Sequence, residues 1–374
     1  MKSNYYTLDR ILKEAPDAIY YVLIGERSNG KTFACLEKII KDYLKDGTQG
    51  VYLRRMGEDI KGRRAMDLFA PFINNPSKGE YLKKLSKGKY VDVQYYGQSW
   101  HMVFEEKDEK TGKVKLQMEK RPFCYRFALN EGEHDKGTSY PLVKTIFFDE
   151  FVTDKWYLPD EFKVFQNMLS TIIRDRDDVK IFMCGNTISK HAPYFAEMGL
   201  THVKDMQKGD LEIYNLGNTK NKIAVEFTTT PTGKKKSDKF FAFDNPEIKM
   251  ITTGAWSISP YPRLPYDYAP CDVLFIYFIV FDKEIFQCEI ISVQNTKFTF
   301  IHRKTTPLKN ENEDLIYSTE FDPRRNHARL LNRPRYKIEK IVWAYFQRGQ
   351  VFYASNDVGD MIRHYLDWCS QQYL

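Results

Sequence analysis

The chain has 374 residues, of which 42% are apolar, and its formal net charge is +7. This length is large for a single core and predicts two domains. No run approaches the roughly 20 consecutive apolar residues of a membrane-spanning helix, so we expect no membrane partner. The positive charge is compatible with a polyanionic partner, although many soluble enzymes are equally basic.

The N-terminal sequence and the cysteine spacing indicate the cellular compartment in which the protein is expected to act. The first residues, MKSNYYTLDRIL, contain no apolar signal-peptide core, so we expect the protein to stay in the cell that makes it. Six cysteines are scattered along the chain without a C-x-x-C pair. This spacing predicts reduced, mostly buried thiols rather than a disulfide framework or a zinc site.

The first predicted element is an apolar strand, Ile19–Ile24, which leads into a phosphate-binding loop. The loop has the pattern G-x-x-x-x-G-K-T and consists of Gly25, Glu26, Arg27, Ser28, Asn29, Gly30, Lys31 and Thr32. In such a loop the backbone N–H groups wrap the phosphates, the lysine reaches the β- and γ-phosphates, and the threonine ligates Mg²⁺. A helix over Lys31–Lys45 follows. This order predicts nucleotide binding over the alternative, a glycine-rich turn without a ligand.

The rest of the first domain alternates apolar strands with amphipathic helices. Further strands are predicted over Gly50–Arg54, Val143–Phe148 and Val179–Gly185, and a second helix over Asp160–Ile173. This alternation is typical of a mainly parallel sheet flanked by helices. A polar insertion, about Lys78–Ser139, lies before the third strand, and we expect it to form antiparallel strands at the edge of the sheet.

Two acidic residues close the strand Val143–Phe148. Asp149 is expected to hold Mg²⁺, directly or through water, and Glu150 to polarise the attacking water. A strand that merely ends in solvated acids is the alternative, and the phosphate loop upstream disfavours it. The adjacent glutamate favours enzymes that hydrolyse ATP for work over kinases of small molecules.

Asn186, at the end of the string VKIFMCGN, is a further candidate catalytic residue. A side-chain amide at this strand tip can sense the γ-phosphate or place the water. The alternative is a plain Gly-Asn turn.

Several arginines are candidates for contact with a transition-state phosphate. Arg27 lies in the loop and would act in cis, whereas Arg174 and Arg176 follow the second helix and would reach a neighbouring subunit. Arg54 and Arg55, at the tip of the second strand, are further candidates. Each of these arginines could instead be a surface ion-pair residue.

The C-terminal part begins after a stretch, Thr228–Asp238, that predicts a linker or exposed loop because it combines proline, glycine and a lysine run. A second proline-rich stretch, Ser259–Pro270, precedes a predicted antiparallel meander and two helices. The meander strands are Val273–Phe281, Ile285–Val293 and Phe298–His302, with Asp282 and Lys283 at the first reversal, and the helices are Lys337–Arg348 and Asn356–Gln371. We therefore divide the chain into an ATPase domain (1–229), a linker region (230–265) and an α+β domain (266–374).

Five strings together resemble the DNA-packaging (encapsidation) ATPases of phi29-type small tailed phages, which are relatives of the large terminase subunits. The strings are IGERSNGKT, GVYLRRMGE, KTIFFDEF, TIIRDRDDVKIFMCGN and APYF. An arginine two residues after the first loop glycine, here Arg27, is a feature of that lineage. The resemblance is strong over Ile19–Phe195 and looser beyond it.

This resemblance implies an ASCE-type P-loop NTPase domain with a mainly parallel sheet, followed by a smaller α+β domain of RNase H-like fold. It implies ATP and Mg²⁺ as cofactors, and a homo-oligomeric ring, of five subunits, on the portal (connector) of an empty capsid in the host cell cytoplasm. The ring would drive double-stranded DNA into the capsid, and a structural RNA is a further candidate partner. Gly25, Arg27, Gly30, Lys31 and Thr32 would bind phosphate and Mg²⁺, Asp149 and Glu150 would form the acidic pair, and Arg174 would be the trans-acting arginine.

One position departs from the family. The family can carry a lysine two residues after the paired arginines, where this chain has Gly57. Lys61 or another basic group must supply any role of that lysine.

Related terminases also carry a nuclease that uses two metal ions held by clustered acids. Here the strand Val273–Phe281 has no carboxylate at its centre, and the nearby acids lie at strand ends, in turns or near a helix start: Asp272, Asp282, Glu284, Asp357 and Asp360. We expect a nuclease-like domain that has lost its acids and grips DNA. A terminase with an active nuclease remains an alternative.

Basic residues in the C-terminal part are candidates for that grip, because phosphate contacts are blind to sequence. The candidates are Lys234, Lys235, Lys236, Arg324, Arg325, Arg329, Arg333 and Arg335. A solvated charged face, or a surface for structural RNA or the portal, is an equally open interpretation.

Two other function classes stay open. A helicase or segregation ATPase should show further nucleic-acid motifs after Asn186, and we find none. A nucleotide-regulated binding module that hydrolyses little is disfavoured by Glu150 beside Asp149.

Overall fold

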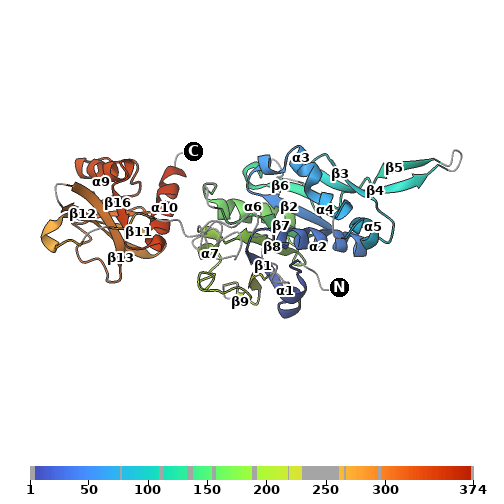
Figure 1. The fold of residues 1–374 in the computed structure, drawn as a ribbon, viewed down its shortest axis with the longest axis horizontal. Helices are drawn as coiled ribbons and strands as arrows, with labels where there is room; N and C mark the ends of the chain where they lie inside the picture. Colours follow the sequence, from blue (N-terminus) through green and yellow to red (C-terminus); the bar gives the residue numbers. More distant parts are fainter. Residues whose placement is uncertain are drawn as a thin grey trace, which may run out of the picture. The chain divides into compact units, whose positions relative to one another are not determined.

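The computed structural model describes residues 5–75, 78–108, 113–132, 138–153, 157–187, 192–217, 219–229, 261–264, 267–293 and 296–371. The chain divides into two units, Met1–Trp256 and Ser257–Leu374 (Figure 1). The division falls within the predicted linker region 230–265, most of which lies outside the described residues. Each unit is described by itself.

A ten-stranded mixed sheet organises the first unit. Its strands are β1 (Ala18–Gly25), β2 (Gln49–Arg54), β3 (Asp92–Tyr96), β4 (Ser99–Lys107), β5 (Val114–Met118), β6 (Cys124–Ala128), β7 (Val143–Asp149), β8 (Lys180–Asn186), β9 (Leu211–Asn215) and β10 (Lys222–Phe227). They lie in the order β3-β4-β6-β2-β7-β8-β1-β10-β9, with β5 paired to β4. The six strands from β6 to β10 in this order are parallel. Their carboxyl ends therefore share one edge of the sheet.

Helices cover both faces of this sheet. They are α1 (Asp9–Glu14), α2 (Lys31–Asp46), α3 (Arg63–Met66), α4 (Ala70–Ile73), α5 (Tyr81–Leu85), α6 (Glu161–Ile173) and α7 (Pro193–Glu197). Alternate residues of β1 belong to different cores: Tyr21 and Leu23 pack with α2, while Val22 and Ile24 pack with α6. Because both faces are buried, the central strands are apolar throughout rather than alternating. The four strands and two helices predicted for this unit are confirmed to within one residue at each end.

The insertion between β2 and β7 matches its prediction only in part. Antiparallel pairing is confirmed for β3, β4 and β5, and the hairpin of β4 and β5 extends beyond the sheet (Figure 1). For β6 the prediction holds on one side only: β6 pairs antiparallel with β4 but in parallel with β2. The pairing of β4 with β6 runs through Ser99 and Trp100. The direction of the chain therefore reverses between β4 and β6, and β6 runs in the same direction as β2.

The second unit contains a six-stranded sheet and two helices. The strands are β11 (Val273–Phe281), β12 (Glu284–Val293), β13 (Thr296–Lys304), β14 (Leu315–Ser318), β15 (His327–Ala328) and β16 (Val351–Tyr353), and the helices are α9 (Lys337–Gln347) and α10 (Asn356–Gln371). The strand order is β15-β14-β11-β12-β13-β16.

The predicted meander is confirmed by the antiparallel pairing of β11, β12 and β13. At its first reversal Asp282 and Lys283 have φ of 51° and 65°, the left-handed values that a two-residue hairpin turn of type I′ requires. Strands β14 and β16 add in parallel to the outer strands of the meander. These strands, and β15, have only two to four residues, too few for a pattern of alternation. In the described residues, no helix combines the length and the apolar character needed to cross a bilayer.

We predict that Ser257–Leu374, expressed alone, folds as an independent unit. It has its own core, in which Tyr277, Tyr317 and Tyr365 are fully buried. A domain of about 120 residues should unfold in one cooperative transition with an enthalpy of about 80 kcal/mol near 60 °C. Differential scanning calorimetry measures this. A broad transition without a clear enthalpy would contradict the division into two domains.

Candidate active site

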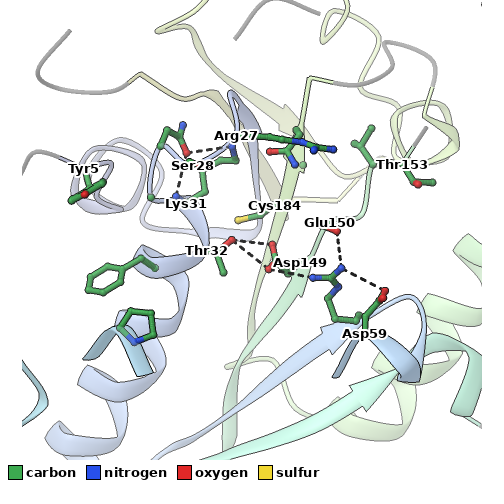
Figure 2. A pocket seen from close by; sticks show the side chains of 18 of the residues that line it. Tyr5, Arg27, Ser28, Lys31, Thr32, Asp59, Asp149, Glu150, Thr153 and Cys184 are labelled. Atoms are coloured by element: carbon green, nitrogen blue, oxygen red, sulfur yellow. Dashed lines mark hydrogen bonds and ion pairs between the residues drawn. The ribbon is translucent and has the colours of Figure 1, made fainter. Parts of the chain in front are cut away.

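A cavity of about 940 Å³ lies at the carboxyl edge of the first sheet, between the phosphate loop and the ends of β2, β7 and β8 (Figure 2). Its volume suits a ligand of nucleotide size. Figure 2 shows Lys31 and Thr32, at the start of α2, close to Asp149, the last residue of β7, and to Glu150, which follows it. The structure therefore brings the predicted loop and the predicted acids to one place.

The phosphate loop is closed around its own lysine. Lys31 Nζ donates hydrogen bonds to the carbonyl oxygens of Glu26 (2.7 Å) and Gly25 (3.1 Å). Burial lowers the pKa of Lys31 to about 8, with Asp149 among the groups that oppose this shift. Gly30, at φ of 102°, turns the chain from the loop into α2, where backbone N–H groups and the helix dipole favour an anion.

Oxygen donors from α2, β7 and β2 meet beside the phosphate loop. Thr32 Oγ1 lies 3.2 and 3.3 Å from the two carboxylate oxygens of Asp149, and the Tyr52 hydroxyl donates to Asp149 Oδ2 (3.1 Å). Burial raises the pKa of Asp149, against the effect of the nearby Arg54 guanidinium. A hydroxyl and a carboxylate in contact, next to a phosphate-binding loop, are the hard oxygen donors that Mg²⁺ takes together with phosphate oxygens. These residues therefore fit Mg²⁺.

Arg54 lies among three acids at this site. Its guanidinium contacts Glu150 Oε2 (2.6 Å), Asp59 Oδ2 (3.5 Å) and Asp149 Oδ2 (3.9 Å). Glu150 is half-exposed, and one of its carboxylate oxygens is occupied by this ion pair. In the arrangement seen here, Arg54 thus restrains the carboxylate that was predicted to polarise water.

Arg55 also lines the cavity, but its hydrogen bonds are with groups other than the carboxylates of these three acids. Its guanidinium is bound by the Glu161 carboxylate and by the carbonyl oxygens of Glu150 and Phe151. This geometry does not support the prediction that Arg55 contacts a transition-state phosphate.

The remaining loop residues divide into two groups. Glu26 and Asn29 are buried and serve the loop itself: Glu26 Oε1 pairs with Lys208 Nζ (3.2 Å), and Asn29 Nδ2 donates to Thr228 Oγ1 (2.7 Å). Arg27 and Ser28 are exposed and line the cavity. Arg27 is thus placed as a residue acting in cis would be.

Thr228 was predicted to begin a linker or exposed loop, and this prediction is wrong for that residue. It is fully buried after the end of β10, and its hydroxyl donates to Ile24 O (2.9 Å) while accepting from Asn29. Its backbone N–H also donates to Ile24 O (2.7 Å). The end of β10 therefore holds the phosphate loop.

Asn186, the predicted sensor, ends β8 and lines the cavity, in register with Gly25 of β1. Arg174 lies elsewhere. It follows α6 at the opposite edge of the sheet, where the neighbouring Arg176 donates to Val143 O (2.5 Å) at the start of β7. Arg174 itself is exposed and donates to Thr138 O (2.9 Å). It cannot reach the cavity of its own chain.

At Gly57, where the family can carry a lysine, a side chain would have to displace the ends of the Glu131 and Arg126 side chains. A Cβ built there would lie 1.8 Å from Glu131 Oε1, because Glu131 pairs with Arg126 over this position. Lys61 instead pairs with Glu58 (2.7 Å) and lies near Glu131 (3.5 Å).

Of the residues predicted to contact DNA, the structure describes the arginines but not the three lysines. Lys234, Lys235 and Lys236 lie outside the described residues. The arginines are held by partners in their own unit: Arg324 by Asp322 (2.7 Å), Arg325 and Arg335 by the Tyr336 ring, and Arg329 by the Trp368 ring. Arg329, Arg333 and Arg335 line a second cavity of about 520 Å³ beside β15.

The acids of the second unit are also engaged. Arg303 binds both Glu284 Oε2 (2.6 Å) and Asp357 Oδ2 (2.5 Å), so a guanidinium lies between two of the carboxylates considered for a nuclease. Over the described ranges of the chain, no group of three or more His, Cys, Asp and Glu side chains is arranged to hold a metal ion.

Four residues around the first cavity were not singled out from the sequence: Tyr52, Asp59, Lys208 and Thr228. Tyr52 could have been found, because alternation along β2 places it and Arg54 on one face at the carboxyl end. Asp59 contacts Arg54, five residues before it, whereas Lys208 and Thr228 follow only from contacts between distant segments.

Comparison with known proteins confirms the resemblance. Residues 65–228 match the model of the family described as Podovirus DNA encapsidation protein (Gp16). The DNA packaging proteins of Bacillus phages B103 and phi29 are 27% identical over 197 residues and 26% identical over 210 residues. These alignments cover 51% and 55% of this chain and 51% and 53% of the relatives, so the match spans about half the length of each.

Two solved structures share the fold over nearly the whole chain. The phi28 gp11 DNA packaging motor aligns with a TM-score of 0.58 at 20% identity, covering 100% of both chains. The bacteriophage phi29 viral genome packaging motor assembly aligns with a TM-score of 0.54 at 18% identity, covering 96% of this chain and 98% of the other.

We predict that Lys31 takes up a proton when nucleotide binds above pH 8. Its pKa is about 8 without nucleotide, and phosphate oxygens favour the charged form and raise it. At about pH 6.5 the group is protonated before and after binding, so uptake should be near zero, whereas at about pH 9 it should approach one proton. Calorimetric titrations in buffers of different ionisation enthalpy measure this. The Lys31→Arg variant, whose guanidinium does not titrate here, should show no such uptake; equal uptake at both pH values would contradict the assignment.

Proposed function

Because this chain is a homologue of the phi29-type DNA packaging proteins, we propose that it is an ATP-hydrolysing motor that moves double-stranded viral DNA into a preformed capsid. One observation carries the proposal: the phosphate loop and the acidic pair, far apart in sequence, converge in one cavity with Thr32 Oγ1 3.2 Å from Asp149. This constellation supports hydrolysis of a nucleoside triphosphate.

The predicted site residues of the cavity have the following roles in the proposed reaction. Lys31 would leave the loop carbonyls to bind the β- and γ-phosphates, and Thr32 and Asp149 would hold Mg²⁺. When bound, Mg²⁺ neutralises the charge of the phosphate oxygens. Glu150 accepts a proton from water as the water oxygen bonds to the γ-phosphorus and the bond to the bridging oxygen of ADP breaks. For this, Glu150 must be released from Arg54.

Two arginines and an amide complete the proposed site. Arg27, exposed at the cavity, would stabilise the transferred phosphoryl group in cis, and Asn186 would orient the water or sense the γ-phosphate. Arg174 would act in trans in the site of the next subunit, because it lies at the far edge of its own sheet.

The proposed partners follow from the relatives. The matched curated proteins are DNA packaging proteins, and a similar chain belongs to a viral genome packaging motor assembly. We propose a homo-oligomeric ring, of five subunits, that acts on the capsid portal in the host cell cytoplasm, with a structural RNA as a further candidate partner. The arginines around β15 and the lysine run Lys234–Lys236 are the proposed DNA contacts.

The second unit is proposed to be an RNase H-like domain without nuclease activity. Its antiparallel meander with β14 and β15 added in parallel beside β11 supports this fold. The ion pairs of Arg303 with Glu284 and Asp357 support the loss of the metal site, because a guanidinium neutralises carboxylates that a catalytic metal would need. No observation favours an active nuclease, a helicase or a segregation ATPase.

Packaging itself tests the proposal. Purified protein, empty capsids, double-stranded DNA and ATP are mixed, and DNA protected from added nuclease is measured. The Glu150→Gln variant should still bind ATP, lose about 10²- to 10⁴-fold in turnover because the proton acceptor is absent, and protect no DNA. If the unaltered protein hydrolyses ATP but protects no DNA, the packaging function is wrong. Persistent turnover in Glu150→Gln would remove Glu150 from its role.

The trans role of Arg174 has its own test. Arg174→Ala chains retain a complete phosphate loop, and Lys31→Ala chains retain Arg174. Each variant alone should hydrolyse little ATP, whereas a mixture should regain activity, because a Lys31→Ala neighbour supplies the missing guanidinium. Steady-state ATPase rates across mixing ratios measure this. A mixture no faster than the average of its parts would exclude action between subunits.

A further inference from the structure

A buried arginine and a buried glutamate lie directly behind the predicted catalytic carboxylate. Arg55, after the end of β2, and Glu161, at the first turn of α6, are 8% and 4% exposed, and Arg55 Nε lies 2.7 Å from Glu161 Oε2. A buried ion pair of this kind is costly unless its remaining donors and acceptors are satisfied. The partners of these remaining donors and acceptors indicate the role of the Arg55–Glu161 pair.

The other nitrogens of Arg55 are bound to the backbone of the catalytic segment. Nη1 donates to the carbonyl oxygen of Glu150 (3.2 Å) and Nη2 to that of Phe151 (2.6 Å). From the other side, the Phe151 N–H donates to Cys184 O on β8 (3.1 Å). The segment that carries the Glu150 side chain is therefore held on two sides.

The backbone of Glu150 needs such support. Its φ is 57°, in the left-handed region that a residue with a Cβ adopts at an energetic cost. A residue persists in this conformation only where its surroundings fix it, and such residues gather at functional sites. The donors of Arg55 to the carbonyls of Glu150 and Phe151 supply that constraint.

Glu161 is in turn oriented from three directions. In addition to Arg55, the Tyr194 hydroxyl donates to Glu161 Oε1 (2.9 Å), and the Leu158 N–H donates to Glu161 Oε2 (2.8 Å). The ring of Tyr157 lies 4.8 Å below the Arg55 guanidinium. The pair is thus fixed in one geometry before any ligand binds.

We infer that Arg55 is a positioning residue for hydrolysis: together with Glu161 it sets the backbone conformation that directs the Glu150 carboxylate at the γ-phosphate. This inference rests on the proposed function, since it assigns Glu150 to the chemical step. The planar guanidinium is essential, because it places three donors at fixed angles toward one carboxylate and two carbonyls, which an ammonium group cannot do. Arg54 and Arg55, adjacent in sequence, therefore act on the same glutamate in different ways, Arg54 on its side chain and Arg55 on its backbone.

The test compares Arg55→Lys with a matched control, Arg126→Lys. Arg126 is equally buried and also binds a carboxylate, that of Glu131 (2.9 Å), and two carbonyls, but those belong to Gly57 and Ile60. ATP turnover and the affinity for a non-hydrolysable ATP analogue are measured for both variants. Arg55→Lys should lower kcat about 10- to 100-fold, the effect of a misplaced catalytic group, and leave analogue affinity within about twofold. Arg126→Lys should leave both nearly unchanged.

The outcomes separate the inference from its premise. No turnover in the unaltered chain would overturn the proposed function, whereas turnover that Arg55→Lys leaves intact would overturn only the positioning role. Equal losses in the two arginine variants, or affinity that falls with kcat, would also overturn it. If Arg55→Lys fails to fold, Tyr194→Phe replaces it, since it removes one hydrogen bond to Glu161 and keeps the ring. A lower kcat at unchanged affinity supports the inference, and an unchanged kcat overturns it.

Discussion

The parallel pairing of β1, β8 and β7 is the constraint on which the active site depends. It places the phosphate loop after β1 and the acids after β7 at one edge of the sheet, with β8 between them. Thr32 and Asp149 meet there although 117 residues separate them. The apolar, two-sided burial of these strands fixes their register, because a slip by one residue would exchange the two cores. The geometry of the site is thus a consequence of packing beneath it.

In the structure, the charged and polar groups of the site form hydrogen bonds and ion pairs with other atoms of the protein. The Lys31 ammonium is bound by loop carbonyls, Glu150 by Arg54, and Asp149 by Thr32 and Tyr52. A nucleotide with its metal must replace these contacts rather than add to them. Nucleotide binding therefore requires the site to rearrange. The affinity for nucleotide reflects the difference in free energy between the contacts within the protein and the contacts with nucleotide and metal.

The sequence predicted those parts of the fold and site whose signals are local. The phosphate loop, the acids Asp149 and Glu150, and the meander turn at Asp282 are each written in a few consecutive residues. Features that depend on distant pairs were missed: β6 joins the central sheet through β2, Thr228 holds the loop through Asn29, and Arg55 finds its partner 106 residues away. The neighbouring sequence is the same for an arginine that binds backbone carbonyls and for one that binds a phosphate, so only the fold distinguishes the two roles.

Helix α6 connects two proposed functional residues that would serve different subunits of the ring. Its first residue, Glu161, is tied through Arg55 to the backbone of Glu150, and Arg174 follows directly after its last turn. The helix has 13 residues, about 20 Å in length, and Arg176 binds its final carbonyls as well as the carbonyl oxygen of Val143 at the start of β7. If α6 shifted as a unit, the proposed catalytic Glu150 and the proposed trans-acting Arg174 would move together. Helix α6 would then link the proposed site of one subunit to that of its neighbour without a further structural element.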